Sequence, residues 1–189
     1  RIIDSLPESP VRADALIATV PGIFPAVKTA DCLPILILDP TRKISAAVHA
    51  GWRGTVLRIT QKVLQILVTE LHMDPADLKV ALGPAIGPCC YEVDDAVLIP
   101  FRKAIPEADR FIQVVSSTEG SALNRIESRR LDLVAANRSE LTGFGVPKEN
   151  IVSIEICTSC HPDLFFSYRR DGSPSGRHLA VTGFKCSTT

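Results

Sequence analysis

Short apolar runs and one longer helical pattern alternate along the first half of the chain. Residues 14–19 (DALIAT), 33–38 (LPILIL) and 44–49 (ISAAVH) are apolar runs of strand length. Over residues 54–72, apolar side chains recur at the spacing of one helix face. Because only the polar stretch DPTRK separates the second run from the third, we expect these two strands to form an antiparallel hairpin.

The second half of the chain continues the same alternation between strand-like and helix-like segments. Glycine and proline are scattered rather than concentrated, so no linker or domain boundary is indicated. The pattern predicts a mixed α/β fold of one domain, residues 1–189, with helices packed on the outsides of β-sheets. The predicted elements are strands at 78–82, 111–115, 151–156 and 178–182, and helices at 94–104 and 131–141.

Composition and charge exclude two classes of partner. The 21 Lys and Arg residues balance the 21 Asp and Glu residues, so there is no excess of positive charge to attract nucleic acid. No apolar run reaches the length of about 18 residues that a membrane-spanning helix needs. The first dozen residues do not resemble a signal peptide. We therefore expect a cytoplasmic enzyme whose six cysteines are reduced.

Two motifs lie at the ends of the predicted hairpin strands. Cys32, in TADC, directly precedes one strand, and His49, in HAGWRG, ends its partner. Antiparallel pairing brings these two ends to the same edge of the sheet. A thiolate and an imidazole there suit zinc or copper, and could equally act as a nucleophile with its base. A buried thiol that serves only packing is the alternative for Cys32.

The HAGWRG motif also has features of an anion or substrate site. Gly51 and Gly54 allow the backbone to approach a ligand closely, with Trp52 between them. The Arg53 guanidinium can hold a phosphate or carboxylate through two hydrogen bonds, or stabilise the charge of a leaving group. The predicted helix start adds free N–H groups. The simpler alternative is a strand-to-helix turn with an arginine on the surface.

Two loops in the second half hold further candidate residues. In GPAIGPCCYEV, Cys90 could border a pocket, and Glu92 could act as a general acid or base. In SYRRDGSPSGR, Arg169, Arg170 and Asp171 could bind phosphate or ribose. Buried thiols in a tight turn, a solvated carboxylate and a plain charged turn are the respective alternatives.

The segment CTSCH, residues 157–161, matches two redox or cofactor patterns. It spells the C-x-x-C-H of haem attachment, but there is no export signal and only one methionine. A zinc knuckle would need a second cysteine pair, and we find none at a suitable spacing. We interpret Cys157 and Cys160 as two thiols at the end of a strand.

Several segments, taken in order along the chain, resemble the laccase-domain, or YfiH-like, family. They are TADCLPILILD, AAVHAGWRG, ALGPAIGPCCYEV, the helix that contains AAN, ICTSC, FFSYRRDG and the GR that follows. Its members are also called multicopper polyphenol oxidases or purine nucleoside phosphorylases. The resemblance covers residues 14–184, and TADC combined with HAGWRG is highly specific. It implies a layered α/β/β/α fold.

The resemblance also implies a metal site. The family binds one zinc, or copper in some preparations, through one Cys and two His, and Cys32 and His49 match two of these ligands. The remaining His belongs to a segment upstream of residue 14, and residues 1–12 contain no His. The resemblance therefore implies that this sequence lacks its N-terminal part.

The activities that the resemblance implies act on purine nucleosides. They are phosphorolysis of adenosine, inosine, guanosine or methylthioadenosine, with phosphate as the second substrate, and hydrolytic deamination of adenosine. Among the matching positions, Arg53 and Glu92 are the candidate catalytic residues. Two alternatives stay open, a copper-dependent polyphenol oxidase and a metal-free Cys–His hydrolase.

Overall fold

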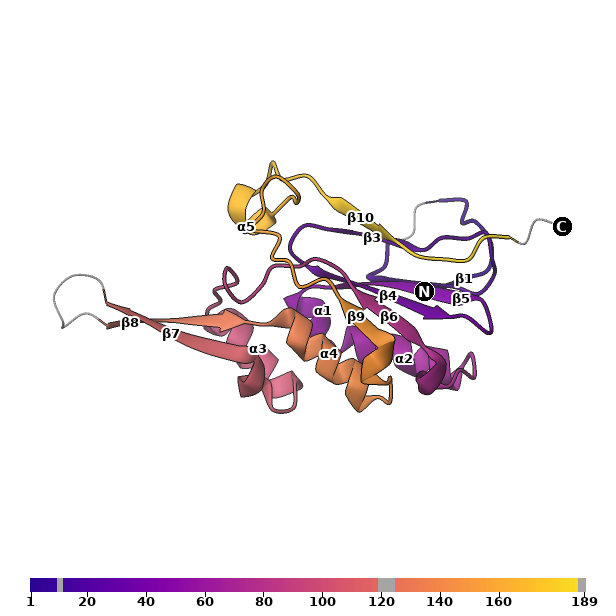
Figure 1. Cartoon of the computed structure of the whole chain (residues 1–189), viewed down its shortest axis with the longest axis horizontal. Helices are drawn as coiled ribbons and strands as arrows, with labels where there is room; N and C mark the ends of the chain where they lie inside the picture. Colours follow the sequence, from indigo (N-terminus) through magenta and orange to yellow (C-terminus); the bar gives the residue numbers. More distant parts are fainter. Residues whose placement is uncertain (10–11, 119–124, 187–189) are drawn as a thin grey trace.

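A six-stranded mixed sheet forms the middle layer of the molecule (Figure 1). The computed structural model describes residues 1–9, 12–118 and 125–186. The outer strand pairs, β1 with β2 and β6 with β9, are parallel, and the pairs between them are antiparallel. In spatial order the strands are β1 (Ile2–Ile3), β2 (Ala15–Ala18), β5 (Ile44–Ala50), β4 (Leu33–Asp39), β6 (Lys79–Leu82) and β9 (Ile151–Ser153).

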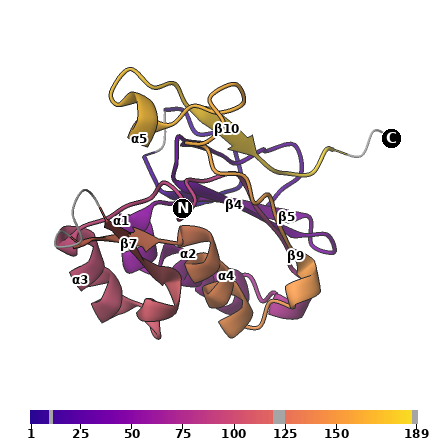
Figure 2. The same ribbon diagram turned by 60° about the vertical axis from the view of Figure 1, so that its left-hand side comes forward.

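Helices cover one face of this sheet and a two-stranded sheet covers the other (Figures 1 and 2). The mixed α/β prediction is confirmed. On the side of the small sheet, the described residues form one short helix, α5 (Tyr168–Asp171), which lies beside that sheet and not over it (Figure 1). The covering helices are α1 (Trp52–Val56), α2 (Ile59–Thr69), α3 (Asp95–Ala104) and α4 (Leu133–Gly143), and the small sheet pairs β3 (Ala26–Thr29) with β10 (His178–Val181).

The remaining elements are short or project from the layers. Helix α5 (Tyr168–Asp171) lies on the same side as the small sheet (Figure 2). An antiparallel ribbon of β7 (Ile112–Thr118) and β8 (Arg125–Leu131) extends away from the helices (Figure 1). The described residues also form the 3₁₀ helices η1 (Pro75–Asp77), η2 (Ala108–Phe111) and η3 (Lys148–Asn150).

The central strands are buried on both faces because layers lie above and below them. In β4, Leu33 and Ile35 are fully buried, and five of the seven residues are buried. A nearly continuous apolar run is what such a doubly covered strand needs. Strand β5 is rich in alanine, so the neighbouring layers can approach it closely, with Ala46 and Ala47 almost fully buried. This packing holds the ends of β4 and β5 in fixed positions.

The predicted hairpin is confirmed, with Leu33 paired to Ala50 and Pro34 to His49. The single helix predicted over residues 54–72 is wrong, because the chain forms α1 and α2 instead. Arg58 separates them in a left-handed conformation, with φ 58° and ψ 41°. The apolar spacing continues through the break, so the sequence pattern alone does not reveal it.

The other predicted elements are present, with shifted ends. The strand predicted over 151–156 is shorter and ends at Ser153. The sequence pattern missed β1, β3, β8 and α5, which are short or polar. Strand β8 is arginine-rich and pairs only with β7 in a two-stranded ribbon, so it lacks the apolar run of a buried strand. Among the described residues, every helix is too short or too polar to span a membrane.

Candidate active site and a cysteine cluster

The hairpin of β4 and β5 brings Cys32 and His49 to one edge of the main sheet. Cys32 directly precedes β4, and Pro34 pairs with His49 in the adjacent strand. Gly51 follows β5 and lies against the same sulfur: a Cβ atom at this position would be 2.8 Å from Cys32 Sγ. Only glycine allows this approach, so Gly51 and Cys32 are matched to one another.

The His49 imidazole lies between the Asp14 carboxylate and the Cys32 sulfur. Its Nδ1 is 3.1 Å from Asp14 Oδ1, and its backbone N–H donates to the Asp14 carbonyl at 2.7 Å. The hydrogen bond with Cys32 raises the pKa of His49 to about 9; burial opposes this increase, and Asp14 adds to it. With Nδ1 engaged by a carboxylate, Nε2 is the nitrogen left for a metal or a thiol.

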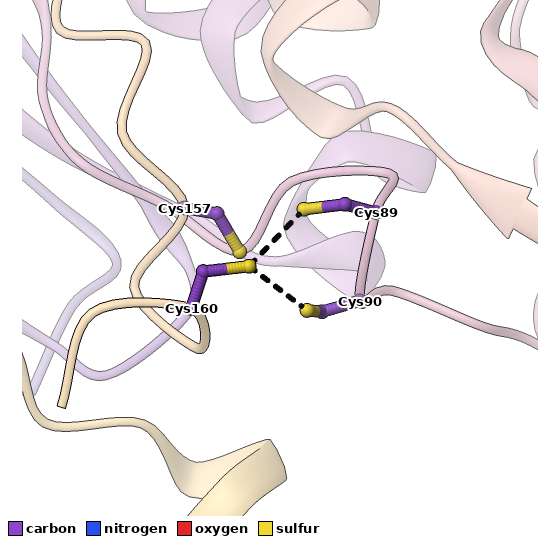
Figure 3. A group of neighbouring side chains, drawn as sticks. All are labelled: Cys89, Cys90, Cys157 and Cys160. Carbon is purple, nitrogen blue, oxygen red and sulfur yellow. Dashed lines mark hydrogen bonds between the residues drawn. The ribbon is translucent and has the colours of Figure 1, made fainter.

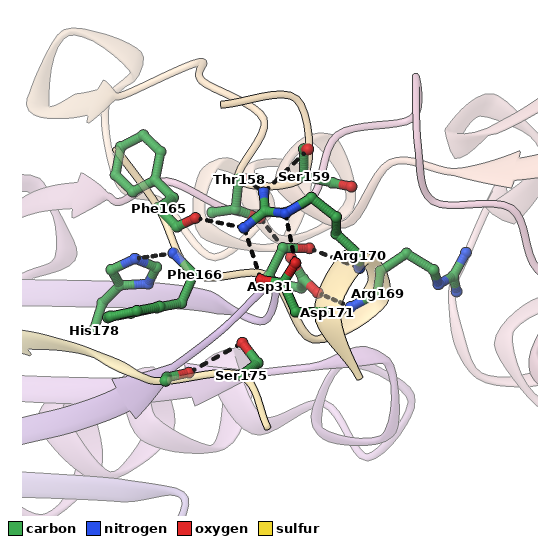
Figure 4. Close-up of polar contacts among 12 residues, drawn as sticks. Asp31, Thr158, Ser159, Phe165, Phe166, Arg169, Arg170, Asp171, Ser175 and His178 are labelled. Atoms are coloured by element: carbon green, nitrogen blue, oxygen red, sulfur yellow. Dashed lines mark hydrogen bonds and ion pairs between the residues drawn. The ribbon is translucent and has the colours of Figure 1, made fainter. Parts of the chain in front are cut away.

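Asp31 connects the Cys32 segment to the loops after β6 and β9 and to α5. It is buried and has a positive φ of 82°. Its carboxylate accepts one hydrogen bond from the Thr158 hydroxyl and one from the Arg169 backbone N–H, both at 2.6 Å (Figure 4). Its carbonyl accepts from the Ile86 N–H at 2.9 Å. The aspartate of TADC therefore fixes the position of the cysteine beside it.

Cys32 and His49 line a cavity of about 540 Å³. That volume lies within the usual range for small-molecule sites, about 300–1,000 Å³. The rest of the lining combines positive charge with aromatic surface. Four basic side chains contribute, namely Lys28, Arg53, Arg169 and Arg177, together with the three aromatic residues Trp52, Tyr91 and Tyr168.

Three of the cavity's arginines lie over its three aromatic rings. Each pair is defined by the distance from the guanidinium carbon to the ring centroid, which is within the range of cation–π contacts. The pairs are Arg53 over Trp52 at 4.3 Å, Arg169 over Tyr91 at 5.1 Å and Arg177 over Tyr168 at 5.7 Å. Each pair therefore has a flat surface on which a planar ring can stack and, a few ångströms away, a positive charge that can bind an anion.

Tyr91 and Arg169 form a fixed part of the cavity wall. Burial raises the pKa of Tyr91 to about 12, and the nearby Cys32 adds to the increase, so the phenol stays protonated at neutral pH. Arg169 Nη1 donates to the Glu92 carbonyl at 2.8 Å and to the Cys90 carbonyl at 3.3 Å. These bonds hold the guanidinium against the loop that follows β6.

The other predicted site residues fall into two places. Gly54 and Gly51 flank the start of α1, and a Cβ at Gly54 would be 3.3 Å from the His49 carbonyl. The exposed Glu92 and the half-buried Cys90 line a neighbouring cavity of about 610 Å³, which shares Trp52, Tyr91 and Arg169 with the first. Because α1 has only five residues, its dipole is smaller than that of the long helix expected there.

Arg170 and Asp171 bind each other and the neighbouring loop (Figure 4). Arg170 Nε and Nη2 donate to the two Asp171 carboxylate oxygens at 2.7 and 2.8 Å. The same guanidinium donates to the carbonyls of Thr158, Ser159 and Phe165 at 2.9–3.2 Å. Arg169 lines the 540 Å³ cavity and these two residues do not, so their predicted contact with substrate stays a prediction.

Four cysteines, two from each of two loops, converge outside the 540 Å³ cavity (Figure 3). Our interpretation that Cys157 and Cys160 have no second pair is wrong: Cys89 and Cys90 provide it, and all four sulfurs lie within 4.8 Å of one another. Burial opposes ionisation of Cys157, but the backbone N–H groups of Gly87 and Cys160 outweigh it, and with the neighbouring thiols they lower the pKa of Cys157 to about 7. The cluster could hold a metal ion.

Two other histidines, His161 and His178, are engaged away from Cys32. His178 Nε2 accepts the backbone N–H of Phe166 at 2.9 Å (Figure 4). His161 Nδ1 lies 3.0 Å from the Cys157 carbonyl. Within the described part of the chain, Cys32 and His49 therefore provide two of the three protein ligands that a catalytic zinc normally has. The donors fit one soft or borderline ion, not several copper centres.

A mixed α/β domain with a thiol–imidazole pair in a basic, aromatic-lined cavity defines the class of protein. The chain belongs to the family described as multi-copper polyphenol oxidoreductase laccase, whose sequence model matches residues 2–185. This finding confirms the resemblance drawn from the TADC and HAGWRG motifs.

The relatives of known sequence include enzymes of purine metabolism by name. A protein of Geobacillus stearothermophilus named purine nucleoside phosphorylase YlmD is 41% identical over 170 residues, which cover 90% of this chain and 59% of that protein. A protein named adenosine deaminase RL5, from an unknown prokaryotic organism, is 40% identical, and the match covers 87% of this chain and 59% of that protein. The chain thus spans about three fifths of the length of these relatives.

Solved structures agree with this assignment. The crystal structure of a Bacillus licheniformis hypothetical protein YfiH superposes with a TM-score of 0.81 at 36% identity, over 91% of this chain and 61% of that one. The structure of YlmD from Geobacillus stearothermophilus gives a TM-score of 0.78 at 39% identity, with the same coverage of both chains. The fold is therefore shared with these proteins across most of the present chain.

The sequence pattern did not single out several residues of the site. Asp14 begins a strand that was predicted, but its place beside β5 depends on sheet order, which the pattern does not give. Lys28 lies on β3, which was missed altogether. Arg169 was among the charged residues considered in SYRRDGSPSGR, but Arg177, in the same polar segment, was not. The adjacent Cys89 and Cys90 were the one available signal for the cysteine cluster.

Proposed function

We propose that this protein is a metal-dependent purine nucleoside phosphorylase that also deaminates adenosine. The observation that carries the proposal is the convergence, in one cavity, of the Cys32–His49 pair with four basic and three aromatic side chains. Purine rings stack on aromatic and guanidinium surfaces, and phosphate needs cations. The names of the relatives, purine nucleoside phosphorylase and adenosine deaminase, support the same two reactions.

The metal, which we propose to be zinc, would be held by Cys32 and His49, with Asp14 orienting the imidazole through Nδ1. When bound, zinc supplies Lewis acidity to the site. One further ligand completes the usual set of three. The thiolate and the imidazole also suit copper, so the identity of the metal is part of the proposal.

Different side chains of the cavity would bind the phosphate and the purine base. In phosphorolysis a phosphate oxygen bonds to C1′ of the ribose, the N9–C1′ bond breaks, and its electrons leave with the purine, which takes up a proton. Arg53, Lys28 and Arg177 neutralise the phosphate, and the rings of Trp52 and Tyr168 offer surfaces for the base. Glu92, in the adjoining cavity, is the proposed proton donor.

A direct assay of products tests the proposal. The purified protein, loaded with zinc, is incubated with adenosine and phosphate, and adenine, ribose 1-phosphate and inosine are separated by chromatography. We expect all three products, and we expect Cys32→Ala to abolish them while Cys186→Ala, at an exposed cysteine outside the cavity, keeps them. The absence of turnover from protein with its metal fully loaded would contradict the proposal.

A second candidate is a metal-free thiol hydrolase, which one specific contact favours. Asp14, His49 and Cys32 form a carboxylate–imidazole–thiol series of the kind that activates a nucleophilic cysteine. Iodoacetamide separates the two candidates. Rapid alkylation of Cys32 that excess zinc does not slow would favour the hydrolase, whereas full protection by zinc favours the metal enzyme.

A further inference from the structure

We propose that Cys89, Cys90, Cys157 and Cys160 bind a zinc ion through four thiolates, and that this ion holds together one wall of the cavity. This site is separate from the Cys32–His49 pair and does not depend on the proposed function. In Figure 3 the four sulfurs point toward a common centre, two from each of two loops.

The topology explains why the two cysteine pairs meet. Cys89 and Cys90 follow β6, and Cys157 and Cys160 follow β9. These strands are parallel neighbours, so their loops leave the sheet at the same edge, and an isolated bridge between Ala85 and Cys157 continues the pairing. The convergence of the pairs is therefore a consequence of the sheet order.

The sulfur positions match the needs of tetrahedral zinc. A zinc–sulfur distance of about 2.3 Å places the four sulfurs of a tetrahedron about 3.8 Å apart. Cys160 Sγ lies 3.6 Å from Cys89 Sγ and 3.3 Å from Cys90 Sγ, and no pair of the four exceeds 4.8 Å. Small rotations of the side chains are enough to close this arrangement around an ion.

The backbone around the cluster is arranged as in a preformed metal site. The Gly87 N–H donates to Cys157 Sγ at 3.3 Å, a contact that favours the thiolate over the thiol. Tight turns fold each loop: Cys90 N–H donates to the Gly87 carbonyl, and Cys160 N–H to the Cys157 carbonyl. A Cβ on Gly87 would lie 3.4 Å from both Cys157 Cβ and Cys89 Sγ, so a larger residue would crowd the sulfurs.

A single metal explains all four thiols better than disulfides do. All six cysteines are free, although Cys89 and Cys160 are exposed and close together. One disulfide would use two sulfurs and leave the others without a role. Four thiolates at the corners of a tetrahedron are the ligand set of structural zinc sites, in which no position is open to a substrate.

The two loops that the zinc would join carry the residues that shape the cavity. Thr158, between the second pair of cysteines, donates its hydroxyl to Asp31 at 2.6 Å, next to Cys32. Tyr91 follows Cys90 directly and lines the cavity, and the Cys90 carbonyl accepts from Arg169. A zinc ion that fixes the four cysteines would therefore also fix Tyr91, the Thr158 hydroxyl that binds Asp31, and the Cys90 carbonyl that accepts from Arg169.

The test measures metal in a Cys32→Ala background, where the Cys32–His49 pair cannot hold an ion. We expect about one zinc per chain, with an X-ray absorption spectrum fitted by four sulfurs at about 2.3 Å. Adding Cys89→Ser and Cys160→Ser should remove the zinc, and adding Cys186→Ser, at an exposed cysteine outside the cluster, should not. If the double serine variant fails to fold, the X-ray absorption spectrum of the Cys32→Ala protein still shows whether four sulfurs bind the zinc.

Several results would overturn the assignment. They are a zinc-free Cys32→Ala protein, nitrogen or oxygen atoms in the first coordination sphere, iron in place of zinc, or a mass lower by the two hydrogens of each disulfide. Hydrogen exchange then tests the role of the ion. Removing zinc with a chelator should speed amide exchange at Thr158, Tyr91 and Arg169 and leave exchange in β5 unchanged. If these three amides exchange at the same rates with and without zinc, the ion does not hold the cavity wall together.

Discussion

At the scale of single residues, the site depends on close contacts that a small change would break. His49 is held from two sides, by Asp14 and by Cys32, and Gly51 leaves room for the cysteine sulfur. The sequence motifs TADC and HAGWRG singled out Cys32 and His49, and the structure brings these two residues into one cavity. Asp14 could not be identified in that way, because its contact arises from the lateral pairing of β2 with β5.

Gly51→Ala should weaken metal binding at Cys32 without unfolding the protein. The new methyl group would lie 2.8 Å from the sulfur, so the thiolate must move out of position. We expect zinc affinity at this site to fall by about 10–100-fold, the range seen when the surroundings of a ligand are disturbed. Competition with a chromogenic chelator measures it.

Gly143→Ala is the matched control, because a methyl group there meets nothing within 4 Å. Gly143 ends α4, so the substitution should keep zinc affinity and leave stability unchanged or slightly increased. Equal zinc affinities for Gly51→Ala and Gly143→Ala would show that the contact with Cys32 does not matter.

The ionisation of His49 gives a second prediction at this scale. In metal-free protein, NMR titration should find His49 with a pKa near 9, raised first by Cys32 and then by Asp14. Because the folded-state pKa lies above the unfolded value of about 6.5, the resulting stabilisation is complete below that value and is lost as pH rises through about 9. Cys32→Ala should lower the pKa of His49 markedly, and an unchanged titration would disprove the contact.

At the scale of elements, the break between α1 and α2 is the feature that the hydrophobic pattern did not predict. Arg58 adopts a left-handed conformation at the break, which is unfavourable for a residue with a side chain. Its guanidinium compensates by joining two other helices: Nη1 donates to the Ala104 carbonyl of α3 at 3.1 Å, and Nε lies 2.7 Å from Glu140 in α4. Tertiary contacts of this kind override local spacing, so sequence periodicity does not show them.

Arg58→Ala should destabilise the fold by about 3 kcal/mol, because it leaves the buried Glu140 carboxylate without its cation. Burial already raises the pKa of Glu140 against the effect of Arg58. A raised carboxyl pKa means that the folded state binds the proton more tightly, so stability of the variant should fall as pH rises through that pKa. Urea unfolding at several pH values measures both effects.

Two further variants complete this test. Adding Glu140→Gln to Arg58→Ala should recover part of the lost stability and remove its pH dependence. Arg138→Ala breaks an exposed ion pair with Glu155 and should cost less than about 1 kcal/mol. Similar losses for Arg58→Ala and Arg138→Ala would show that the helix junction does not rely on the buried pair.

At the scale of the whole molecule, the cavity is built where several parts of the fold meet. The β4–β5 edge supplies Cys32 and His49, the loop after β6 supplies Tyr91, and the segment around α5 supplies Tyr168 and Arg169. The alternation of apolar runs was enough to predict a mixed α/β fold. It could not show that the loops after β6 and β9 meet, because Cys89 and Cys160 are 71 residues apart in the chain.

We propose two metal ions at separate places, a catalytic ion at Cys32 and His49 and a structural ion at the four-cysteine cluster. The measurement that tests this most directly is anomalous diffraction at the zinc edge from crystals of the zinc-loaded protein. We expect one peak between Cys32 Sγ and the His49 ring, and a second peak at the centre of Cys89, Cys90, Cys157 and Cys160. A map with no peak between Cys32 and His49 would contradict the account of a metal-dependent active site.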